Sequence, residues 1–163
     1  MSKKTSILIL NGPNLNMLGT REPEHYGTMT LAAIEDSCSA LAAANGYACT
    51  CFQSNHEGEL VSKIQEAIGT HQAIIFNAGA YTHTSVALRD ALSNYDGVSV
   101  EVHLSNVYKR EEFRHKSLLA PVVSGVIAGL VLQATQPRFV WLMNYSPKSK
   151  SSGGQDGQRL NHV

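Results

Sequence analysis

A glutamate and a histidine two positions apart could carry out acid–base chemistry in this sequence. The segment from Val98 to Leu104 alternates between apolar and polar residues, as a half-buried strand does, and Glu101 and His103 fall on its polar face. An imidazole gains and loses a proton near neutral pH. Alone, such a pair usually faces solvent. At the carboxyl end of a strand in an α/β sheet, a catalytic role is an equal alternative.

A second polar stretch also follows an apolar run. Residues 74–76 are typical of a buried strand, and small or polar residues then continue to Ser85, where a helical pattern begins. Ligands bind outside the carboxyl ends of strands in open parallel sheets, so Asn77 and His83 are candidates for contact with a ligand. A tight turn in which Asn and Thr side chains satisfy backbone groups explains the stretch equally well.

Two charged segments carry further candidates. A polar segment between two glycines contains Arg21 and Tyr26 and could form a lid, although an ordinary surface loop is the simpler interpretation. Residues 105–115 are charged and helical in pattern, and they place Arg110 and Arg114 on one face. These two guanidinium groups could hold an anion or another loop, or they could belong to a solvated helix face.

Alternating strand and helix patterns predict the fold that positions these residues. Five apolar segments are typical of strands, at residues 6–10, 47–52, 72–76, 98–104 and 122–129. Thr30 is a plausible N-cap for the first helix, and Ser54 with Glu57 fits a capping box for the second. We therefore expect an α/β protein with a doubly wound, five-stranded parallel sheet of flavodoxin type, in three α/β/α layers and a single domain of residues 1–145.

The composition excludes several classes of protein. The 163 residues include 13 basic and 13 acidic side chains, so no basic excess indicates nucleic acid or an anionic membrane as a partner. The apolar run near the N-terminus is too short for a signal peptide, and no run could span a membrane. Three cysteines without a CxxC motif indicate free thiols. We expect a cytoplasmic protein.

Four sequence blocks share a characteristic order and spacing. They are Asn11-Gly12-Pro13-Asn14-Leu15-Asn16 with Leu18-Gly19-x-Arg21-x-Pro23-x-x-Tyr26-Gly27; Asn77-Ala78-Gly79-Ala80-Tyr81-Thr82-His83-Thr84-Ser85; Glu101-x-His103-Leu104-Ser105-Asn106; and Arg110-Glu111-x-Phe113-Arg114-His115-x-Ser117. Together they resemble the type II 3-dehydroquinate dehydratase family from about Ile7 to Gly129. The resemblance implies a flavodoxin-like fold, a trimer-based homo-oligomer that is usually a dodecamer, and a lyase that needs no metal or cofactor.

The reaction implied by this resemblance is the loss of water from 3-dehydroquinate to give 3-dehydroshikimate, by anti elimination through an enolate. Tyr26 would be the base, Arg21 would activate it, and His103 would be the acid that protonates the departing hydroxyl. A tyrosine in water ionises near pH 10, and an adjacent guanidinium favours the phenolate. The sequence does not distinguish a role in the biosynthesis of aromatic precursors from one in quinate breakdown.

The resemblance also implies the remaining roles. Asn14 would position water at the enolate, Glu101 would tune His103 or hold a catalytic water, and Arg110 would brace the lid. The substrate-binding residues would be Asn77, His83, Leu104, Ser105, Arg114 and Asp90, of which Asp90 would reach the site of a neighbouring subunit.

The sequence departs from the family after Gly129. Pro137 would break or kink a last helix. Residues 146–163 are almost all polar and are expected to form a disordered tail. We interpret this end as a divergent or frame-altered C-terminus that leaves the catalytic blocks intact.

Three other functions are alternatives to the dehydratase. A flavin-binding electron carrier would need a phosphate loop after the first strand, but residues 11–19 contain neither GxGxxG nor a P-loop. A metal hydrolase could use His83, His103 and Glu101, yet no ligand pair has the spacing of a zinc motif. The strongest alternative is an inactive relative that binds a carbocyclic acid without turning it over.

Overall fold

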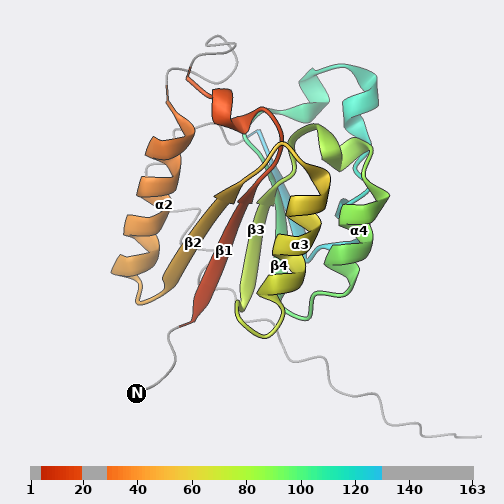
Figure 1. Cartoon of the computed structure of the whole chain (residues 1–163). Helices are drawn as coiled ribbons and strands as arrows, with labels where there is room; N and C mark the ends of the chain where they lie inside the picture. Colours follow the sequence, from red (N-terminus) through yellow and green to blue (C-terminus); the bar gives the residue numbers. More distant parts are fainter. Residues whose placement is uncertain (1–4, 20–28, 130–163) are drawn as a thin grey trace, which may run out of the picture.

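A five-stranded parallel sheet lies at the centre of the protein (Figure 1), in a computed structural model that describes residues 5–19 and 29–129. The strands are β1 (Ser6–Asn11), β2 (Ala48–Gln53), β3 (Ala73–Asn77), β4 (Val98–His103) and β5 (Gly125–Ala128); the α-helices are α2 (Leu31–Ala44), α3 (Glu57–Ala67) and α4 (Val86–Ser93). The strand order is β2-β1-β3-β4-β5, and every adjacent pair is parallel. The predicted flavodoxin-like fold is thus confirmed.

Helices cover both faces of the sheet because successive strand residues point in opposite directions. Leu8 and Leu10 of β1 pack with α3 and α4, whereas Ile7 and Ile9 pack on the side of α2. Figure 1 shows α2 apart from the layer formed by α3 and α4. A strand buried on both faces needs apolar residues at every position, which explains the unbroken apolar run in β1. Among the described residues, no helix combines the length and apolar character needed to cross a bilayer.

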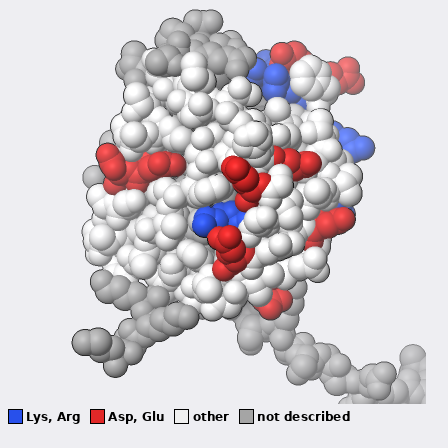
Figure 2. All heavy atoms as spheres, in the orientation of Figure 1, with Lys and Arg blue, Asp and Glu red and all other residues white. Residues whose placement is uncertain are grey.

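The surface over α3 and α4 carries several charged side chains, most of them acidic (Figure 2). Figure 2 shows acidic and basic side chains singly or in small mixed groups on this face, with wide uncharged areas between them. This distribution agrees with a chain in which only 16% of the residues are charged.

The helix starts follow the predictions only in part. Thr30 begins α2 as predicted, since its Oγ1 accepts a hydrogen bond from the backbone N–H of Ala33 at 3.2 Å. The capping box predicted for α3 is wrong. The helix begins two residues later than that box requires, because His56 and not Ser54 is its N-cap, and the hydroxyl of Ser54 donates to the side chain of Glu59 at 2.5 Å instead of pairing with Glu57.

The segment after β4 does not form the helix that its charge pattern predicted. It forms two 3₁₀ turns, η3 (Val107–Lys109) and η4 (Glu112–His115), and Arg110 between them is extended. The side chain of Asn106 accepts a hydrogen bond from the backbone N–H of Tyr108 at 3.1 Å, which closes a local turn in place of a helix. Arg110 and Arg114 therefore do not share a helical face.

β1 and β3 approach each other closely where they end. The N–H of Gly12 donates to the carbonyl of Asn77 at 2.7 Å, and a Cβ on Gly12 would lie 2.4 Å from the carbonyl oxygen of Ala78. Only glycine fits at this contact. The strand order also reverses here, because β2 lies on one side of β1 and β3 on the other. In open α/β sheets this is the point where ligands bind.

Candidate active site

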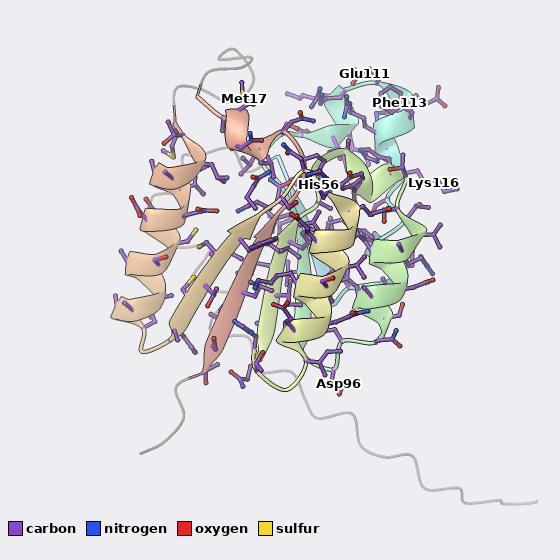
Figure 3. The ribbon with its side chains drawn as sticks, in the orientation of Figure 1. Met17, His56, Asp96, Glu111, Phe113 and Lys116 are labelled. Atoms are coloured by element: carbon purple, nitrogen blue, oxygen red, sulfur yellow. The ribbon has the colours of Figure 1, made fainter. Side chains whose placement is uncertain are left out.

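A cavity of about 360 Å³ lies beyond the carboxyl ends of β1, β3 and β4. The predicted site residues that line it are Asn14, Asn77, His83, His103, Leu104, Ser105, Arg110 and Arg114; Pro13, Leu15, Met17, Leu18, Gly79, Ala80, Val107 and Glu111 complete the wall. Figure 3 places Met17, Glu111 and Phe113 at this end of the molecule and Asp96 at the opposite end. The structure thus gathers most of the predicted residues in one place.

Asn14 is held in an unusual backbone conformation at the cavity wall. With φ 66° it is the one non-glycine residue in the described ranges with a positive φ. Its N–H donates to Oδ1 of Asn55 at 2.9 Å, and the hydroxyl of Tyr81 donates to the carbonyl of Asn55, also at 2.9 Å. Asn55 therefore ties together the loops that follow β1, β2 and β3. Asn55 is not among the residues predicted for the site, although its position just after a parallel strand was a signal that could have identified it.

Glu101 and His103 form a buried pair behind the cavity. Glu101 is 0% exposed and His103 is 8% exposed, and Oε1 of Glu101 lies 2.7 Å from Nε2 of His103. Burial raises the pKa of the Glu101 carboxyl, but hydrogen bonds from His103, Thr82 and Ser117 lower it, and the pKa lies below its usual value. An ionised carboxylate only accepts hydrogen bonds, so Nε2 carries the hydrogen.

The other ring nitrogen of His103 is the one available to a ligand. His103 lines the cavity, and Nδ1 has no hydrogen-bond partner among the residues that the structure describes. The solvent-facing arrangement considered for this pair is excluded by its burial. Glu101 itself does not line the cavity and can act there only through its neighbours.

Two hydroxyl groups complete the surroundings of Glu101. Thr82 Oγ1 donates to Oε1, and Ser117 Oγ lies 2.9 Å from Oε1 and 2.8 Å from Oε2. Both residues stand in the sequence blocks, but neither was given a role. Strand alternation shows which residues share a face, and it does not show which hydroxyls from distant loops close over that face.

His83 is fixed beside His103. The two rings are stacked with centroids 6.5 Å apart and planes inclined by 11°. Nδ1 of His83 lies 2.7 Å from the carbonyl oxygen of Lys116, and because a carbonyl only accepts, Nδ1 carries the hydrogen. Phe113 packs edge-on against the same ring. The other ring nitrogen of His83, Nε2, therefore points away from Lys116.

Arg110 and Arg114 bring two guanidinium groups to the cavity, with Glu111 between them. Glu111 Oε2 accepts a hydrogen bond from Nε of Arg114 at 2.7 Å and lies 3.6 Å from Nε of Arg110. Its own backbone N–H and the Arg114 side chain hold the pKa of Glu111 below its usual value. An anion that binds Arg114 has to compete with this carboxylate.

The remaining predicted residues fall into two groups. Asp90 lies on α4, is exposed, and does not line the cavity of its own chain. Arg21 and Tyr26, like the predicted tail, lie outside the described residues. Within the described ranges, no cluster of three or more His, Cys, Asp or Glu side chains is arranged to hold a metal ion.

Comparison with known proteins places this cavity in a family. The family model for dehydroquinase class II matches residues 5–137. The chain belongs to the class II dehydroquinase family. A 3-dehydroquinate dehydratase of Ruegeria pomeroyi is 57% identical over 129 residues, which cover 79% of this chain and 87% of that protein. One from Haemophilus influenzae is 50% identical over 148 residues, covering 91% and 99%.

Solved structures agree with this family. The crystal structure of a type II dehydroquinase from Propionibacterium acnes superposes with a TM-score of 0.79 at 35% identity, covering 86% of this chain and 98% of that one. The family inferred from the four sequence blocks is therefore confirmed. Membership in the class II dehydroquinases favours the dehydratase over the electron carrier, the metal hydrolase and the inactive binding protein.

Proposed function

We propose that this class II dehydroquinase removes water from 3-dehydroquinate to give 3-dehydroshikimate, by anti elimination through an enolate. Family membership and the names of its relatives support the dehydratase activity. The reaction needs a base for the proton beside the ketone, a group that stabilises the enolate, and an acid for the leaving hydroxyl.

His103 is the proposed acid, and its geometry is the observation that carries the proposal. Its ring lines the cavity, and its Nε2–H is held by ionised Glu101. A carboxylate in this position stabilises the imidazolium that must form before proton donation. The proton on Nδ1 passes to the hydroxyl, which leaves as water, and Nε2 keeps its hydrogen throughout.

Tyr26 is the proposed base, and Arg21 is the cation that favours its phenolate. Connectivity supports this assignment, because Met17 and Leu18 line the cavity and the segment that carries both residues follows directly after Gly19. Asn14, on the same wall, would place a water molecule at the enolate oxygen.

The cavity offers suitable groups for a carboxylate with several hydroxyls. Asn77, His83, Arg114 and the Leu104–Ser105 segment line it and are the proposed binding groups, with Arg110 as a brace for the segment that carries Tyr26. The volume of about 360 Å³ lies within the range of small-molecule sites.

An absorbance assay for enone formation from 3-dehydroquinate tests the proposal. We expect turnover by the wild type, and a loss of about 10²–10⁴-fold in kcat in Tyr26→Phe and in His103→Ala, with KM little changed. Tyr108→Phe and His56→Ala, two exposed residues outside the proposed machinery, serve as matched controls and should keep normal turnover.

Each negative result has its own meaning. Unchanged kcat in Tyr26→Phe would reject the base, and unchanged kcat in His103→Ala would reject the acid. Tight binding of 3-dehydroquinate by a wild-type protein that never turns it over would establish the inactive binding protein instead.

A further inference from the structure

Three hydrogen-bond donors converge on the carboxylate of Glu101, which has no exposure to solvent. They are the hydroxyls of Thr82 and Ser117 and the Nε2–H of His103. Thr82 is itself fully buried, and neither Thr82 nor Ser117 lines the cavity. The two hydroxyls can therefore affect a ligand only through Glu101 and His103.

The hydroxyl protons can be assigned from the surrounding donors. Ser117 Oγ accepts hydrogen bonds from the backbone N–H groups of Leu119 at 3.0 Å and Ala120 at 2.9 Å. A hydroxyl has two acceptor lone pairs and one proton, so the proton of Ser117 is directed at the carboxylate. Thr82 Oγ1 lies 3.2 Å from Ser117 Oγ, and its own proton also points to Glu101.

The hydrogen bond between Glu101 and His103 has two possible protonation states. The pair can hold one proton on Nε2, which leaves a carboxylate. Alternatively, it takes up a second proton from solvent, so that a carboxylic acid O–H at Oε1 donates to Nε2 and the ring hydrogen of a neutral His103 lies on Nδ1. Burial favours the neutral carboxylic acid, whereas donors directed at the oxygens favour the carboxylate. The balance therefore depends on groups outside the pair.

We propose that the hydroxyls of Thr82 and Ser117 keep this proton on Nε2 of His103, and so select Nδ1 as the nitrogen that exchanges a proton with the substrate. Both residues are positioning residues that act through Glu101. The inference rests on the proposed function for its catalytic consequence, but the proton position itself can be measured without substrate.

Solid-state ¹⁵N NMR of protein with ring-labelled histidine measures this position directly, because protonated and unprotonated imidazole nitrogens have distinct shifts. The His103 signals are identified by their loss in His103→Ala. We expect Nε2–H in the wild type and in Thr82→Ser, which keeps the hydroxyl. In Thr82→Val and Ser117→Ala, signal from the Nδ1–H tautomer should appear.

Turnover gives a second and separate measurement. Thr82→Val has nearly the shape of threonine, and it should lower kcat at least about 10-fold, as part of the contribution of a positioned general acid, with KM unchanged. Thr82→Ser should restore most of kcat. Thr70→Val, which removes an exposed hydroxyl that bonds only local groups at the end of α3, is the matched control and should leave kcat unchanged.

A thermodynamic cycle distinguishes this mechanism from a loss of packing. In a Glu101→Gln background, Thr82→Val should cause no further loss of kcat, whereas a packing defect would add to the loss. Wild-type tautomer signals in both Thr82→Val and Ser117→Ala would overturn the inference. If the wild type does not turn over 3-dehydroquinate, the proposed function fails, while the NMR result still decides the position of the proton.

Discussion

Two residues, Asn14 at the cavity wall and Glu101 behind it, adopt states that are unfavourable in isolation. A left-handed backbone costs about 1–2 kcal/mol in most residues, less in asparagine and little in glycine, and an uncompensated buried carboxylate costs several kcal/mol. Asn55 holds the backbone of Asn14, and three donors hold Glu101. Conformations and charges that are unfavourable alone, and that surrounding hydrogen bonds stabilise in or next to a cavity, are typical of functional sites.

Substitution of Asn14 separates its backbone role from its side-chain role. Asn14→Ala should be less stable than Asn14→Gly by about 1 kcal/mol, because alanine is disfavoured at φ 66° and glycine is not. Both variants lack the amide group, so both should lose turnover to a similar extent. Urea denaturation and kcat measure the two effects. Full turnover in Asn14→Gly would show that the amide has no part in catalysis.

At the scale of the elements, the close contact between the ends of β1 and β3 fixes the shape of the cavity. Gly12→Ala should destabilise the protein by about 1–3 kcal/mol, because the new methyl group meets the backbone carbonyl of Ala78. Gly58→Ala is the matched control. Its Cβ would meet nothing within 4 Å, and in α3 it should stabilise by about 0.5–1 kcal/mol. Chemical denaturation monitored by circular dichroism compares them, and equal stabilities would contradict the contact.

The sequence predicted the elements better than it predicted their surroundings. Apolar runs and alternation located all five strands, and parallel order then placed Asn77 and His103 at one edge. The pattern after β4 was misleading, because helical spacing of charges does not reveal that Asn106 closes a turn. The sequence also contained no sign that Thr82 and Ser117, which are 35 positions apart, meet at Glu101. That contact depends on how two loops fold over the sheet.

For the whole molecule, the exposed position of Asp90 supports the proposal of a shared site. Asp90 lies on α4, away from the cavity of its own chain, as expected if it serves a neighbouring subunit. This proposal requires a homo-oligomer, and the resemblance implies one built from trimers.

Complementation between inactive variants tests the shared site. Asp90→Asn and His103→Ala should each have low turnover alone, but co-expression should regenerate roughly a quarter of the sites, those that take His103 from one subunit and Asp90 from the next. Co-expression of Tyr26→Phe with His103→Ala should regenerate none, because both residues are proposed for the same chain's site. No recovery in the first mixture would reject the role of Asp90.

The ion pair between Glu111 and Arg114 has a consequence for how an anionic substrate enters. The guanidinium of Arg114 is already paired with the carboxylate of Glu111 on the same loop. A substrate carboxylate that binds Arg114 therefore takes the place of Glu111, and the number of contacts between opposite charges stays the same. Dissolved salt weakens attraction between unpaired charges far more than it affects such an exchange. The stability of the Michaelis complex should accordingly depend less on the ionic strength of the buffer than it would if Arg114 were unpaired.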